Sequence, residues 1–87
     1  MTDDVKKKTW MNRVEDTCLF HKECCRKDES WRIEDTAKAL NRSTGRISED
    51  LMVGDWLKTH RSTIEKFRYI GDAIEFIRKR KKEMRMM

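Results

Sequence analysis

Residues 31–51 read WRIEDTAKALNRSTGRISEDL, and the spacing within this stretch decides the fold. Two short helices that cross at a tight turn need a small residue where they touch, and Ala37 supplies it. The turn needs a residue that tolerates positive φ, which Asn41 does better than most non-glycine residues. Ser43 is a good N-cap for the second helix. Ile47 is expected to pack an apolar side chain of the second helix against the first helix. The spacing predicts a helix-turn-helix within residues 31–60.

Helical patterns flank this motif on both sides. A first amphipathic helix is predicted over residues 4–27 from apolar positions three, four and seven residues apart: Met11, Val14, Cys18 and Cys25, with Trp10 and Leu19 beside them. The second helix covers residues 34–40. The third follows Ser43, turns Ile47 and Leu51 inward, and is expected to bend or break at Gly54. A short helix near residues 63–67 and a last one from Gly71 complete the pattern.

The composition agrees with an all-α single domain of about five helices, divided into residues 1–30, 31–60 and 61–87. The chain has 87 residues, no proline and 43% charged residues, while strand signals are nearly missing. It holds no long apolar run, so no membrane span is expected. Three cysteines without an export signal favour a reduced, cytoplasmic setting. A chain this short has little room for a substrate cavity, and we expect no enzyme and no cofactor.

The net charge of +5 is unevenly distributed. Residues 1–30 carry seven basic and seven acidic side chains, and residues 31–57 carry four and five. Residues 58–87 carry ten basic and four acidic side chains, so the whole surplus lies in the last third. This distribution indicates a polyanionic partner, usually nucleic acid. A basic helix end that serves only solubility remains the alternative for residues 78–82.

The motif resembles the helix-turn-helix of the ParB/KorB partition proteins and of small phage and plasmid regulators that share it. The matching segments are residues 36–40 (TAKAL), 42–43 (RS) and 47–51 (ISEDL). The chain departs from the family at Asn41, where glycine is usual, and it has no room for a nucleotide-binding domain. The resemblance covers about a quarter of the chain. It implies sequence-specific binding of double-stranded DNA, often as a homodimer on a palindrome.

In such a motif the second helix enters the major groove with its N-terminal side chains at the base edges. The predicted base-reading residues are Ser43, Thr44, Arg46, Ser48 and Glu49. Arg46 is the best candidate for a bidentate contact to guanine, whereas Glu49 either accepts from cytosine or pairs with a cation. Contacts to phosphates position the protein on the duplex without specifying sequence. The predicted phosphate contacts are Lys38, Arg42, Lys58, Arg78, Lys79 and Arg80.

Three further hypotheses stay open on the sequence. Cys18, His21 and Cys25 share one helix face, but structural zinc sites usually gather ligands from two chain segments, so we expect no metal. The first helix, with Trp10, Met11 and Val14, is an alternative dimer surface. A protein-interaction module that binds a host protein is the rival function, because one fold serves many functions and residues 31–57 carry net charge −1.

Overall fold

The computed structural model describes residues 3–85, with side chains described from residue 9 onward. It contains the helices α1 (Asp3–Lys27), α2 (Ile33–Leu40), α3 (Thr44–Thr59), α4 (Arg61–Ile64) and α5 (Ile70–Arg85). No strand occurs between residues 3 and 85, which confirms the predicted all-α class. No helix within that range is long and apolar enough to cross a membrane.

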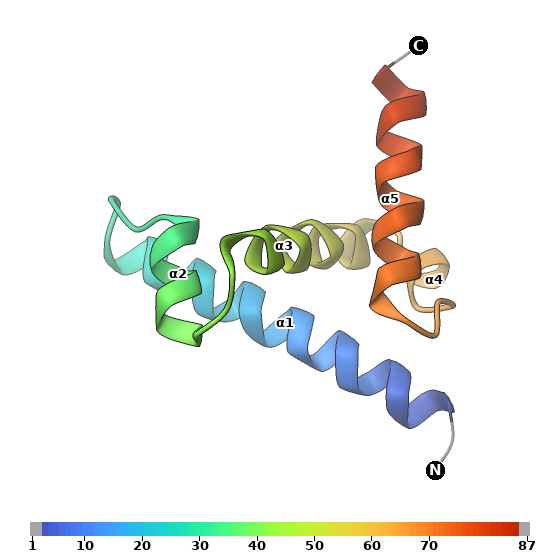
Figure 1. Ribbon diagram of the computed structural model, residues 1–87, viewed down its shortest axis with the longest axis horizontal. Helices are drawn as coiled ribbons and strands as arrows, with labels where there is room; N and C mark the ends of the chain where they lie inside the picture. The colour runs from blue at the N-terminus through green and yellow to red at the C-terminus, as the bar shows by residue number, and fades with distance from the viewer. Residues whose placement is uncertain (1–2, 86–87) are drawn as a thin grey trace.

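Helix α3 is the centre of the arrangement and contacts each of the other four helices. Helix α1 runs along one side of α3, and α2 packs at the N-terminal end (Figure 1). Helix α5 crosses the C-terminal end of α3 and projects away from the rest of the protein (Figure 1). The start of α3 and the basic end of α5 therefore form the two arms of an open angle.

The core lies where α1, the second half of α3, α4 and α5 meet. Its buried side chains are Trp10, Val14, Val53, Leu57, Ile64, Ala73, Ile74 and Ile77. On α1 the buried positions are Trp10, Val14 and Thr17, so the predicted stripe through Met11 and Cys18 is rotated by about one residue. Trp10 and Val14 pack inside the protein and are not available as a dimer surface. Leu19, predicted to lie beside the stripe, is 66% exposed.

The turn between α2 and α3 has the conformation that the sequence predicts. Asn41 adopts the left-handed region, with φ 56° and ψ 49°. Its N–H donates to the Lys38 carbonyl at 3.2 Å, and the Arg42 N–H donates to the Ala37 carbonyl at 2.9 Å. This pair of bonds is a Schellman motif, which satisfies carbonyls left open at the end of α2. Ala37 is buried at the crossing, as predicted.

Helix α3 begins at a side-chain cap and passes through Gly54 without a break. The Ser43 hydroxyl oxygen accepts from the Arg46 N–H at 3.2 Å, which satisfies one of the free amides of the first turn. The predicted break at Gly54 is wrong, because α3 is continuous from Thr44 to Thr59. A Cβ there would lie closer than 3.0 Å to Cys18 Sγ, so the glycine lets α1 and α3 approach each other. Leu51, predicted to face inward, is only half-buried.

The fourth helix lies slightly earlier than the sequence predicts. It spans Arg61–Ile64, whereas the apolar pattern placed it near residues 63–67. Ile64 is fully buried, and Phe67 lies beyond the helix end, packed against the core from the connection to α5. This single turn, with Ile64 as its buried residue, redirects the chain from α3 to α5.

Candidate nucleic-acid interface

The first turns of α3 present the predicted base-reading residues to solvent. Ser43, Thr44, Arg46 and Ser48 are exposed, while Ile47 between them is fully buried and anchors the helix over α2. The cap at Ser43 and the left-handed turn at Asn41 fix the residue at which α3 starts, and so the backbone positions of these side chains. These exposed positions at the start of α3 are called the α3 face.

Glu49, the fifth predicted base-reading residue, is engaged by Arg78 of α5. The Arg78 Nη2 donates to Glu49 Oε2 at 2.9 Å. This ion pair joins a predicted base-reading residue to a predicted phosphate contact, two positions 29 residues apart in the chain. It is an exposed pair at Arg78, so its contribution to stability is small. Its main effect is to neutralise the Glu49 carboxylate on the α3 face.

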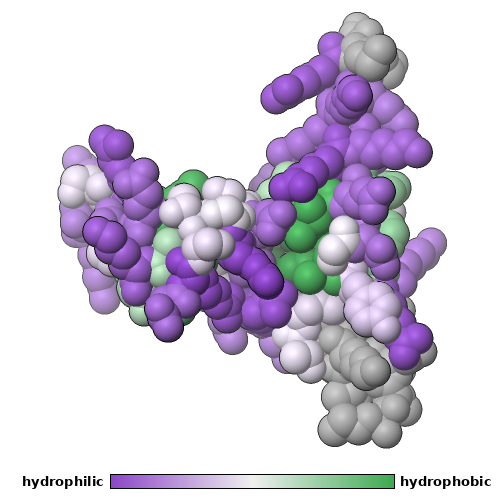
Figure 2. Space-filling view, in the orientation of Figure 1, coloured by the Kyte–Doolittle hydropathy of each residue, from purple (hydrophilic) through white to green (hydrophobic). Residues whose placement is uncertain are grey.

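A groove of about 390 Å³ runs along this face towards α5. Its lining residues are Ser43, Gly45, Arg46, Ser48, Glu49, Met52 and Arg78. Figure 2 shows hydrophobic atoms in the angle between α3 and α5 and hydrophilic side chains over the projecting end of α5. Met52, which sequence reasoning missed, adds an apolar surface beside the polar side chains of the groove. Gly45 has open space around its Cα, so it leaves the groove clear at that point.

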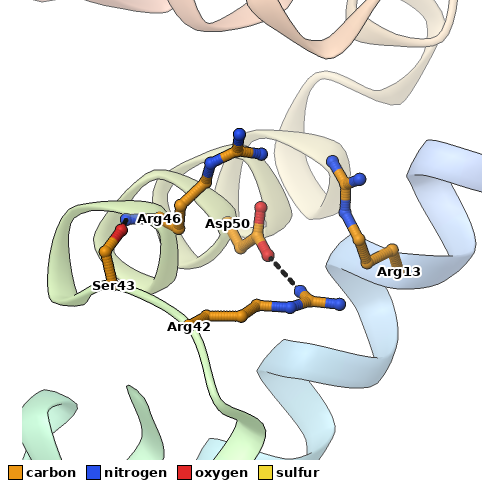
Figure 3. Close-up of a pocket in the computed structure, with 5 residues that line it drawn as sticks. All are labelled: Arg13, Arg42, Ser43, Arg46 and Asp50. Carbon is orange, nitrogen blue, oxygen red and sulfur yellow. Dashed lines mark hydrogen bonds and ion pairs between the residues drawn. The ribbon is translucent and has the colours of Figure 1, made fainter.

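A second hollow, the arginine cleft, lies between α1 and the start of α3. It measures about 280 Å³ and is lined by Arg13, Arg42, Ser43, Arg46 and Asp50 (Figure 3). The three guanidinium groups come from α1, from the turn and from α3. In Figure 3 they surround the Asp50 carboxylate. Arg42 and Arg46 were predicted as DNA contacts, whereas Arg13 and Asp50 were not.

Asp50 is the buried member of the arginine cleft, with 3% of its surface exposed. Its Oδ2 accepts from Thr17 Oγ1 at 3.2 Å and from Arg42 Nη1 at 3.3 Å. Burial raises the pKa of this carboxyl, while the Thr17 hydrogen bond and the charges of Arg13, Arg42 and Arg46 oppose that rise. The carboxylate is therefore buried at a cost and held by donors from two other segments.

The other predicted phosphate contacts are distributed over three places. Lys38 lines a shallow hollow beside the turn, together with Arg42, Ser43 and Thr44. Lys58 instead lines a groove between α1 and α3 with Cys18 and Gly54, apart from the α3 face. Arg78, Lys79 and Arg80 lie on the exposed part of α5, where Arg80 also pairs with Glu83 at 3.5 Å. The structure thus groups Lys38, Arg42 and Arg78 around the α3 face and separates Lys58 from it.

Cys18 contacts α3, whereas His21 and Cys25 contact each other. Cys18 Sγ lies 3.5 Å from the Asp50 carbonyl, and the His21 Nδ1 lies 2.6 Å from Thr36 Oγ1. Cys25 Sγ contacts the His21 Nε2 at 3.5 Å. Among residues whose side chains are described, no three histidine, cysteine or acidic groups are placed to hold a metal ion. The Cys25–His21–Thr36 chain of contacts joins α1 to α2, which is a structural role.

Sequence reasoning missed Arg13 and Thr17 because both lie outside the motif. The signal was present as two polar residues within the buried face of α1, next to Val14 and four residues apart. Comparison with known proteins adds no assignment: no family model, no curated protein and no solved structure matches this chain. The ParB-like resemblance of residues 31–57 stays a prediction.

Proposed function

We propose that the protein binds specific sites on double-stranded DNA by placing the start of α3 in the major groove. The observation that carries the proposal is the α3 face, which is fixed by a left-handed turn at Asn41 and a cap at Ser43. A major groove about 12 Å wide admits one α-helix, and the first turns of that helix reach the base edges. The exposed side chains there carry hydroxyl and guanidinium groups, which suit base contacts.

The electrostatics support the proposal despite the net charge of −1 over residues 31–57. Glu49 is paired with Arg78, and Asp50 is buried among three guanidinium groups. Neither carboxylate is a free surface charge that would repel phosphates. These two carboxylates therefore do not offset the exposed cations of the α3 face, which favour a polyanion.

Helix α5 supports the same binding mode. It projects from the C-terminal end of α3, and its exposed part carries Arg78, Lys79 and Arg80 (Figure 1). A duplex lying against the α3 face would have its backbone near this arm. Cations there add sequence-independent affinity that falls as salt rises.

The biological role that we propose is regulation of transcription, or the marking of an origin or partition site, in a phage or mobile element. We propose that it acts in the cytoplasm as a homodimer, because motifs of this kind commonly read palindromes by two-fold symmetry. The exposed Leu19 is an apolar position that a partner protomer would cover.

The test starts from the purified chain and a pool of randomised duplexes. We expect selection to enrich one sequence, which is then measured against a scrambled duplex by fluorescence anisotropy. Arg46→Ala should reduce discrimination between the two duplexes by about 1–3 kcal/mol, the value of one good bidentate base contact. Arg26→Ala is the matched control, because Arg26 lies on α1 and, among the residues whose side chains are described, pairs only with its neighbour Glu23. No enrichment, or equal loss of discrimination in both variants, would contradict the proposal.

A further inference from the structure

We propose that the arginine cleft is a seat for one phosphate group, with Arg13 and Arg42 as its principal donors. The inference rests on the proposed function, because the DNA backbone is the source of phosphate that this position serves. It assigns a task to Arg13, a residue outside the helix-turn-helix. It also separates the cations that position the protein from Arg46, which reads bases.

The charge balance of the cleft favours a bound anion. Three guanidinium groups face a single carboxylate, so the five lining residues carry a net charge of +2. Arg13 forms no ion pair with any residue whose side chain the structure describes, and neither does Arg46. A phosphate beside Arg13 would supply the negative charge that the protein itself leaves out.

The donors converge from three chain segments. A guanidinium has five N–H donors in a planar fork that matches the oxygens of a phosphate. Within residues 9–85, Arg42 donates only through Nη1, to Asp50 and Thr17, which leaves its other donors available there. The Ser43 oxygen accepts from the Arg46 N–H, so its hydroxyl hydrogen is free to donate. The start of the 16-residue helix α3 adds the positive end of its dipole.

Asp50 is a positioning residue for this seat. Its carboxylate is held by Thr17 on α1 and in turn holds the Arg42 guanidinium. Burying a carboxylate is costly unless it is paired and hydrogen-bonded, and a core position at this crossing would be filled at lower cost by an apolar side chain. The buried acid is explained if its task is to fix the orientation of Arg42 beneath the entering phosphate.

The cleft has room for the ligand. Its volume of about 280 Å³ is many times the share of liquid volume that one water occupies, about 30 Å³. Arg42 and Arg46 are exposed residues at its rim, so a phosphate within a polymer reaches the cleft from solvent. The position beside Ser43 places the phosphate next to the α3 face, where it would set the register of α3 on the duplex.

The first arm of the test uses inorganic phosphate and the full chain. In an NMR titration we expect the side-chain Nε–Hε signals of Arg13 and Arg42 to shift together, with a common saturation curve. Arg13→Gln should weaken this binding at least severalfold, whereas Arg26→Gln should leave it unchanged. Circular dichroism confirms that both variants are folded. Signals that do not move, or that move equally at Arg26, would overturn the seat whether or not the protein binds DNA.

The second arm identifies the DNA backbone as the source. Arg13→Gln should weaken binding to the selected duplex and to a scrambled duplex by the same factor, about tenfold for a lost hydrogen bond to a charged group. It should also reduce the slope of log affinity against log salt by about one. A changed preference between duplexes, or an unchanged slope, would overturn the phosphate assignment. If the wild type shows no site preference, the proposed function fails, while the phosphate titration still decides the seat.

Discussion

Replacing Gly54 with alanine should destabilise the protein, although alanine is the better helix former. Inside a helix, alanine is favoured over glycine by about 1 kcal/mol. Against this gain, the new Cβ would lie closer than 3.0 Å to Cys18 Sγ and 3.4 Å from Val14 Cγ1. Overpacking of this kind costs about 1–3 kcal/mol, because α1 and α3 must separate or Cys18 must leave its rotamer. We therefore expect a net loss of about 0–2 kcal/mol.

Urea unfolding followed by circular dichroism measures this change in the free energy of unfolding. Gly45→Ala is the matched control on the same helix, since a Cβ at Gly45 meets nothing within 4 Å and the variant should be neutral or more stable. The double variant Cys18→Ala with Gly54→Ala should recover the loss, with a coupling of about 0.5–3 kcal/mol. Stabilisation by Gly54→Ala to the same extent as by Gly45→Ala would refute the close approach of α1 and α3.

Three further changes test the turn, the cap and the buried acid by the same unfolding assay. Asn41→Gly should be nearly neutral and Asn41→Ala should lose about 1–2 kcal/mol, because alanine resists the left-handed conformation; equal losses would argue against that backbone. Ser43→Ala should lose about 1 kcal/mol with its cap, whereas Ser43→Asp should not. The raised pKa of Asp50 means that its contribution is fully present below the unfolded pKa of about 3.9 and is lost as pH rises through the folded value. The stability of the wild type relative to Asp50→Asn should therefore increase as the pH falls from 7 towards 4, and a difference independent of pH would count against a strained burial.

The motif could be predicted from the sequence because each of its requirements is local. A small residue at Ala37, a turn residue at Asn41, a cap at Ser43 and an apolar anchor at Ile47 act within about ten residues of one another. Their backbone preferences and spacing are properties of the chain segment itself. The structure places all four as the pattern requires.

The roles of Gly54, Asp50 and Arg78 depend on contacts between distant segments of the chain. The spacing of apolar residues in the sequence does not reveal such contacts. Gly54 was expected to break α3 because glycine has a poor helix propensity. In the structure, the close approach of Cys18 on α1 decides which residue fits at this position. Asp50 counts as surface charge in a sequence, yet Thr17 and Arg42 allow its burial. Arg78 was assigned to phosphates, and only the crossing of α5 over α3 brings it to Glu49.

The affinity ratio between a selected and a scrambled duplex, measured by fluorescence anisotropy at about 150 mM salt, tests the central claim most directly. At this salt concentration non-specific binding is weak, so the ratio reports base reading rather than surface charge. Site-specific recognition through the α3 face predicts tighter binding to the selected duplex by a factor of about 1,000 or more. A ratio near one, with both affinities falling equally as salt rises, would leave only a basic surface and would contradict the account.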